Sequence, residues 1–122
     1  MKNKYKNYRK SKESNMTWAR TTIYYESKKL ERHLNGGGTI ESFSKSLGCR
    51  ESEPDTIEER SNYYYDMVND YRDQMRNQWD KDWYAEHPVN ENHLLDVGRY
   101  LDDWYWAIRQ KMADEDAKKA EE

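Results

Sequence analysis

Apolar side chains recur every three or four residues along most of this chain, a spacing typical of amphipathic helices. The first such run follows Ser14 and Asn15, either of which can cap the start of a helix. Three consecutive glycines at positions 36–38 end the run, because glycine loses more backbone freedom on ordering than any other residue. The apolar positions of this first predicted helix are Met16, Ala19, Ile23, Leu30 and Leu34.

A short second helix is predicted directly after the glycines. Thr39 can cap it, and Ile40, Phe43 and Leu47 then fall on one helical face. Gly48 suits the C-terminal end of this helix, where a left-handed residue is common.

A long third helix is predicted between a loop at residues 49–54 and Pro88. It can begin with Ser52, Pro54 and Asp55, or with Thr56 and Glu59 as a capping box. The proline at its far end stops it, because the residue before a proline is pushed out of the α-helical region. Its apolar positions are Tyr64, Val68, Tyr71, Met75, Trp79 and Trp83.

A fourth helix is predicted after Asn90, which can cap it. From about Ala113 the chain is rich in alanine, lysine and acids, and we expect this end to fray. The apolar positions of this helix are Leu94, Val97, Leu101, Trp104, Ile108 and Met112.

The predicted fold is therefore all-α, a small bundle with two long antiparallel helices, one N-terminal helix and one short helix. Residues 1–13 form a basic flexible arm, residues 14–112 the helical domain and residues 113–122 a frayed acidic tail. Leu, Ile, Val and Phe number only fourteen, so much of the core must come from the eleven tyrosines and five tryptophans. We expect a thin core that self-association or a partner completes.

The sequence favours a cytoplasmic binding protein over an enzyme. The single cysteine, Cys49, excludes an internal disulfide, and neither a membrane span nor a signal peptide is predicted. The glycines lack the pattern of a phosphate loop, and the spacing of His87, Glu91 and His93 fits no helical metal motif. No catalytic residue, metal or cofactor is predicted.

Residues 39–48 resemble the first helix and turn of a helix-turn-helix motif. The loop that follows is longer than the usual turn, and residues 55–59 would bring acids to the DNA phosphates. Recognition of DNA through this segment is therefore disfavoured.

Charge is sorted along the chain. Residues 1–12 carry six basic groups and no acid, and residues 13–54 are balanced. Residues 55–122 carry nine basic and eighteen acidic groups, a charge of −9, together with eleven of the seventeen aromatic residues. This sorting indicates a binding protein with charged partners.

The basic arm is a candidate contact for nucleic acid or for an acidic partner, because cations pair with phosphates while tyrosines stack on bases. The alternative is a tail that only improves solubility. The predicted contact residues are Lys2, Lys4, Tyr5, Lys6, Tyr8, Arg9, Lys10 and Lys12.

The acidic helices are a candidate mimic of nucleic acid. A step of four residues along a helix is about 6 Å, close to the phosphate spacing of one strand. Carboxylates on rigid helices could then occupy a basic groove, with aromatic rings as anchors. The alternative is a solvated face with local ion pairs. The predicted partner-binding residues are Asp66, Asp70, Asp73, Asp80, Asp82, Trp83, Tyr84, Asp102, Asp103, Tyr105 and Trp106.

Two runs of consecutive aromatic residues, at 63–65 and 104–106, support partial exposure of some rings. Successive side chains on a helix point about 100° apart, so one neighbouring helix cannot bury all three. The remaining rings would form a patch of the kind that marks a binding site.

The arm also carries a resemblance to a known family. Tyr5-Lys6-Asn7-Tyr8-Arg9-Lys10 is similar to the basic, tyrosine-bearing N-terminal tails of some phage anti-CRISPR inhibitors of Cas9-type effectors. The resemblance implies a small non-enzymatic inhibitor whose acidic body blocks the DNA groove of a CRISPR effector. The arm would then touch guide RNA or an acidic patch.

The leading hypothesis is an inhibitor that binds a cationic nucleic-acid-binding protein through its acidic, aromatic helices. A second hypothesis is a small protein that binds RNA or DNA through the arm. A third is a self-associating phage structural protein, for instance a homodimer.

Overall fold

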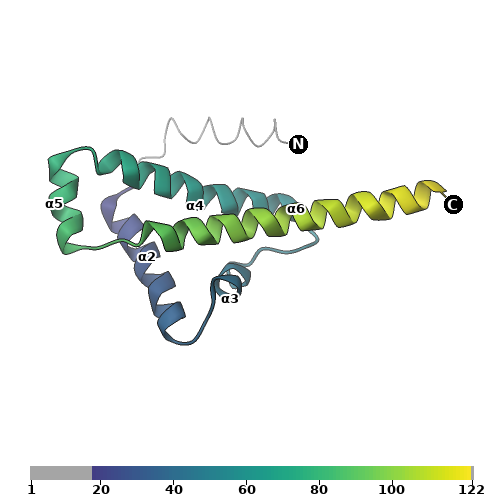
Figure 1. Ribbon diagram of the computed structural model, residues 1–122, viewed down its shortest axis with the longest axis horizontal. Helices are drawn as coiled ribbons and strands as arrows, with labels where there is room; N and C mark the ends of the chain where they lie inside the picture. The colour runs from purple at the N-terminus through teal and green to yellow at the C-terminus, as the bar shows by residue number, and fades with distance from the viewer. Residues whose placement is uncertain (1–17, 122) are drawn as a thin grey trace.

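The computed structural model describes residues 18–121, and every regular element in that range is a helix (Figure 1). The predicted all-α fold is confirmed. The predicted arm, and the contact residues assigned to it, lie outside the described range. The helices are α2 (Arg20–Asn35), α3 (Ile40–Lys45), α4 (Pro54–Gln74), α5 (Gln78–Glu86) and α6 (Glu91–Glu121).

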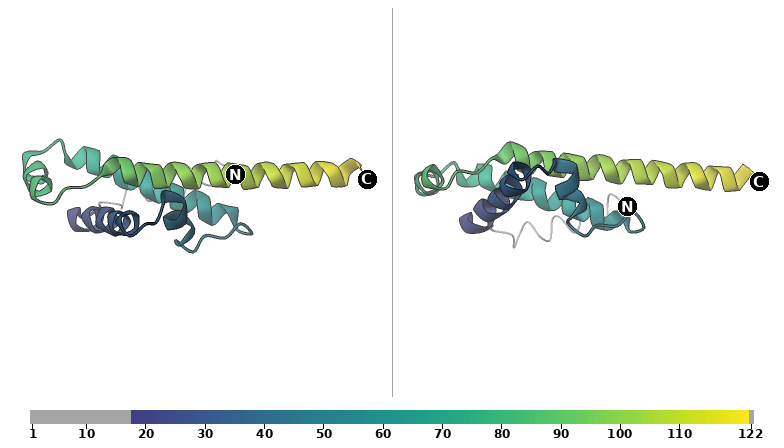
Figure 2. Two further views of the ribbon diagram at one scale, coloured as in Figure 1. Left: turned by 60° about the horizontal axis from the view of Figure 1, so that its bottom comes forward. Right: turned by 90° about the horizontal axis from the view of Figure 1, so that it is seen from below.

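Helices α4 and α6 run antiparallel and share the most extensive contact in the molecule. Helices α2 and α3 lie on one side of this pair, as Figure 2 shows, while α5 turns the chain at one end. The far end of α6 projects beyond the other helices. Among the described helices, none combines the length and the apolar character needed to cross a membrane.

The α4–α6 seam forms the centre of the core. Its fully buried members are Ile57, Tyr64, Met67, Val68, Leu94, Val97, Leu101 and Tyr105. Ser61 and Gly98 are small, so the two helices can approach closely where they meet. At this point the Ser61 hydroxyl donates to the Gly98 carbonyl at 2.8 Å. A Cβ atom added at Gly98 would lie 3.4 Å from the Ser61 backbone oxygen and 3.3 Å from the Tyr65 ring. The crossing therefore leaves little room for a larger side chain.

Helix α2 begins later than the sequence predicts. Its N-cap is Ala19. The predicted caps, Ser14 and Asn15, lie outside the described residues. The backbone of Trp18 is instead held by α4. Its N–H donates to Asp70 at 2.8 Å, and its carbonyl accepts from the Gln74 amide at 2.6 Å.

The end of α2 and the start of α3 follow the sequence pattern. The three glycines at 36–38 end α2, and Gly37 has a φ of +94°. Thr39 caps α3 in a reciprocal arrangement with Ser42, whose N–H donates to the Thr39 hydroxyl at 3.0 Å. Helices α2 and α3 contribute Ile23, Leu30 and Phe43 to the core.

The predicted long third helix is wrong, because it is broken into α4 and α5 at residues 75–77. Asn77 caps α5, and its side-chain oxygen accepts from the Asp80 N–H at 2.9 Å. The hydroxyl of Tyr84 then donates to Gln74, which holds α5 against the end of α4. The helix therefore breaks where Asn77 provides a cap, although the spacing of apolar residues continues through residues 75–77.

Replacing Asn77 by alanine should lower the free energy of unfolding by about 1 kcal/mol, since losing a side-chain cap typically costs this much. Urea denaturation followed by circular dichroism measures the effect. Asn69, exposed on α4, provides the matched control. Asn69→Ala should change stability by less than about 0.5 kcal/mol. Equal stabilities of the two variants would contradict the capping role.

The start of α4 agrees with one of the two predicted alternatives. Pro54 occupies the first turn, after Glu53 as N-cap. The capping box of Thr56 and Glu59 is wrong, because Thr56 already lies inside the first turn and its hydroxyl donates back to the Glu53 carbonyl at 2.7 Å.

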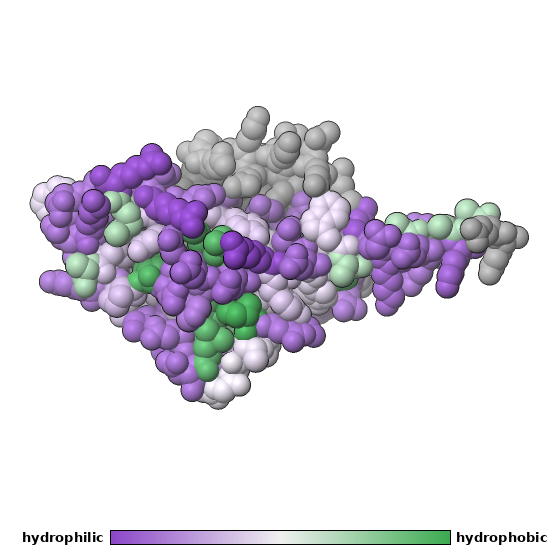
Figure 3. All heavy atoms as spheres, viewed as in Figure 1, coloured by the Kyte–Doolittle hydropathy of each residue, from purple (hydrophilic) through white to green (hydrophobic). Residues whose placement is uncertain are grey.

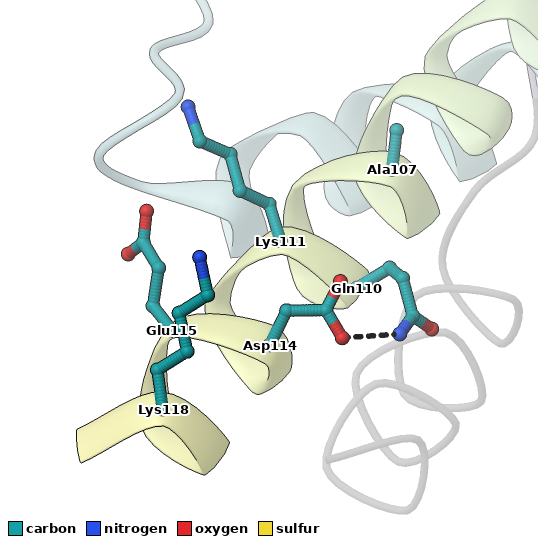
Figure 4. A pocket seen from close by; sticks show the side chains of 6 residues that line it. All are labelled: Ala107, Gln110, Lys111, Asp114, Glu115 and Lys118. Carbon is teal, nitrogen blue, oxygen red and sulfur yellow. Dashed lines mark hydrogen bonds between the residues drawn. The ribbon is translucent and has the colours of Figure 1, made fainter. Parts of the chain in front are cut away.

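Helix α6 is capped by Asn90 as predicted, since the Asn90 side-chain oxygen accepts from the His93 N–H at 3.2 Å. Helix α6 continues to Glu121, where the sequence pattern predicts fraying from about Ala113. Residues 113–120 are exposed, so local interactions must hold these turns. One is the hydrogen bond from the Gln110 amide to Asp114 at 3.0 Å (Figure 4). Alanine and lysine also favour helix.

Candidate partner-binding surface

Two of the predicted acidic residues hold the fold together. Asp70 accepts from the Trp18 N–H at 2.8 Å and from the Gln74 amide at 3.1 Å. Burial raises the pKa of the Asp70 carboxyl, and these hydrogen bonds offset part of that rise. Asp80 pairs with Arg20 at 3.4 Å, and its side chain is only 19% exposed. Both acids attach the start of α2 to the corner between α4 and α5.

The other predicted acids lie in two separate places. Asp73 and Asp82 are exposed at the end of the molecule that carries α5. Asp102 and Asp103 lie along α6, near the N-terminal half of α4, because the Ser61–Gly98 contact aligns the two antiparallel helices there. Asp66 is half-buried on α4. The predicted acids therefore do not form one continuous row.

Most of the predicted aromatic anchors are part of the packing. Tyr84 and Tyr105 are buried. Trp83 is half-buried and stacks on His87, with ring centroids 4.0 Å apart. The Arg20 guanidinium lies 5.3 Å from the centre of the Trp83 ring. Trp106 is 43% exposed, so one ring of the 104–106 run does face solvent.

Trp79 is the large aromatic residue that the sequence pattern misplaces. The pattern puts it on the buried stripe of a continuous helix, yet it is 84% exposed on α5. The break at residues 75–77 changes the direction in which the next helix presents its side chains. The capping signal of Asn77 followed three residues later by Asp80 could have revealed this break.

We define the α5 surface as Trp79 with the exposed acids beside it in the sequence, Asp73, Asp82 and Glu86. The bases Arg76 and Lys81 are also exposed there, and Arg76 lies 3.8 Å from Asp73. The carboxylate of Asp82 accepts from the Gln78 amide at 2.9 Å. This surface can present one large apolar ring within an acidic, hydrogen-bonding rim.

Figure 3 shows the hydropathy of one face of the molecule. Hydrophilic residues cover most of the face in view, and hydrophobic ones gather where the end of α2 meets α3. Among the described residues, three large hydrophobic side chains are exposed, and Trp79 is the most exposed of them at 84%.

The histidines do not form a metal site with Glu91. His87 is stacked on Trp83, and its Nδ1 lies 2.9 Å from the Trp83 carbonyl. Glu91 pairs with Arg72 at 3.0 Å. Within residues 18–121 no three His, Cys, Asp or Glu side chains gather closely enough to hold a metal ion. Burial raises the pKa of the Cys49 thiol, which makes it less nucleophilic at neutral pH.

Comparison with known proteins finds no match to this chain among protein-family models, curated proteins or solved structures.

Proposed function

We propose that this protein is a non-enzymatic inhibitor that binds a nucleic-acid-binding protein through the α5 surface. The observation that supports it best is the 84% exposure of Trp79. Burying a large aromatic ring on binding removes apolar area from water, which is favourable. Tryptophan is also enriched among the few side chains that dominate binding energy at interfaces.

The charge around Trp79 indicates the sign of the charge on the partner's surface. The three exposed acids of the α5 surface outnumber its two exposed bases, Arg76 and Lys81, and residues 55–122 carry a net charge of −9. Such a surface attracts a basic partner and repels an acidic one. Extended basic surfaces are typical of proteins that bind nucleic acids. The inhibitor would occupy that basic site and exclude DNA or RNA from it.

The most specific form of this proposal is a phage anti-CRISPR protein that acts in the bacterial cytoplasm on a CRISPR effector. The resemblance at residues 5–10 and the acidic helical body support it. In this form Trp79 anchors the inhibitor beside the DNA groove of the effector.

The test uses two probes, a purified CRISPR effector loaded with guide RNA and the heparin-binding proteins of a nuclease-treated bacterial lysate. Immobilised wild-type protein should retain a protein from at least one probe, and double-stranded DNA should displace it. Trp79→Ala should weaken this binding at least tenfold, because truncating an anchor residue commonly costs more than about 1.4 kcal/mol.

Tyr100→Ala is the matched control, since Tyr100 is also a partly exposed aromatic residue but lies on α6, outside the α5 surface. It should leave the affinity within about twofold, and both variants should keep the circular dichroism of the wild type. Absence of binding to both probes, or equal binding by Trp79→Ala, would refute the proposal.

A further inference from the structure

Helix α2 carries its basic and acidic side chains on different sides, although the segment to which it belongs has no net charge. Residues 13–54 contain equal numbers of acids and bases. The buried side chains of α2 are Ile23, Ser27 and Leu30, and they lie on one side of the helix. At about 100° per residue, the opposite side carries one tyrosine and three cations and no acid. We call this set the α2 basic face, and its members are Tyr25, Lys28, Lys29 and Arg32.

The two acids of α2 lie away from this face and are engaged. Glu26 accepts a hydrogen bond from the hydroxyl of Tyr64 at 3.3 Å, across the contact with α4. Glu31 lies at the flank and pairs with Lys28 at 3.6 Å. Lys29 and Arg32 are both exposed. The acids of α2 therefore do not cancel the positive charges of Lys29 and Arg32 on this face.

The aromatic member of the face is exposed but supported. Tyr25 is 63% exposed, and its ring centroid lies 5.7 Å from that of Tyr24. The Lys28 ammonium lies 5.8 Å from the centre of the Tyr24 ring. Tyr25 itself precedes Lys28 and Lys29 by three and four residues, a spacing that puts neighbouring turns of a helix on one side. An aromatic ring beside cations is the arrangement that a stacked base next to its phosphate requires.

We propose that the α2 basic face binds single-stranded nucleic acid, with the cations on phosphates and Tyr25 stacked on a base. Lys28 and Arg32 are one helical turn apart, about 6 Å along the axis, close to the spacing of successive phosphates on a strand. The face has no aliphatic side chain to insert into a lipid surface. The proposal is independent of the α5 surface.

Fluorescence anisotropy with a labelled oligo(U) of about 20 nucleotides tests this proposal in the full chain. Binding should weaken as salt rises. For three phosphate contacts on a single strand, the slope of log K against log salt concentration is about −2. The triple variant K28Q/K29Q/R32Q should therefore have a slope shallower by about 2 than that of the wild type. Tyr25→Leu should weaken binding about tenfold, as expected for the loss of one stacked base.

The triple variant K111Q/K118Q/K119Q is the matched control and should keep the salt slope of the wild type, because these three exposed lysines lie on α6, outside the α2 basic face. Circular dichroism should show that all variants are folded. Three results would overturn the proposal: no binding at low salt, an unchanged salt slope in the triple variant, or displacement of oligo(U) by polyglutamate as effectively as by unlabelled oligo(U). The last would identify an acidic polypeptide as the ligand.

Discussion

Replacing Leu101 by alanine should lower the free energy of unfolding by about 3 kcal/mol. Leu101 is 0% exposed in the α4–α6 seam. Truncating a buried leucine loses its transfer free energy and leaves a cavity, at a combined cost of about 2–5 kcal/mol. The close crossing at Ser61 and Gly98 limits how far the two helices can move together to fill that cavity.

Urea denaturation followed by tryptophan fluorescence measures this change. The slope of the free energy of unfolding against urea concentration should be the same as in the wild type. Leu95 lies on the same helix and is half-buried, so Leu95→Ala provides the control. We expect it to cost less than half as much, because less apolar area is lost. Equal costs for the two leucines would mean that the seam is not the centre of the core.

The protein should lose stability steeply above pH 10, because three buried tyrosines must stay protonated in the folded state. Burial raises the pKa of Tyr64 and Tyr84, and burial together with Glu58 raises the pKa of Tyr105 to about 12. In the unfolded chain a tyrosine ionises near pH 10. The unfolded state therefore releases protons first.

The sign of the effect follows from proton linkage. Below about pH 10 both states hold these protons, so the stabilisation is fully present. Above it, each tyrosine that ionises only in the unfolded state lowers the free energy of unfolding by about 1.4 kcal/mol per pH unit. Three tyrosines give a slope of about 4 kcal/mol per pH unit. From pH 10 this slope removes a stability of about 5 kcal/mol near pH 11 and one of about 8 kcal/mol near pH 12, both within the range usual for small domains.

Circular dichroism and tyrosinate absorbance recorded together against pH provide the measurement. The loss of helix should coincide with a cooperative rise in tyrosinate. Tyr105→Phe removes one of the three groups and should reduce the slope of stability against pH by about a third. Ionisation of every tyrosine near pH 10 with the helices intact would contradict the prediction.

Local signals in the sequence identify several helix ends correctly. Thr39, Pro54 and Asn90 each act within one turn of their own position, so their roles can be predicted without a structure. The break before α5 could not be predicted from periodicity, because the apolar spacing runs through Met75 to Trp79. The local signal for two helices is the polar side chain of Asn77, which caps α5.

The candidate site was less predictable, since it depends on contacts between distant residues. Asp70 is held by a backbone N–H that lies 52 positions away in the chain. Asp80 is held by Arg20, at the start of another helix. From composition alone both acids are expected to be surface charges, whereas in the fold they make contacts that hold α2 against α4 and α5. The α2 basic face was not predicted either. The net charge of a segment does not show on which side of a helix its basic and acidic residues lie.

The position of α5 between the two seam helices sets an expected order of folding. Only residues 75–90 separate α4 from α6, so little chain entropy is lost when these helices meet. The contact of Trp18 with Asp70 closes a loop of 52 positions and costs more. We therefore expect the α4–α5–α6 unit to assemble first and α2 to dock afterwards. Release of α2 would then be the first step when the protein opens.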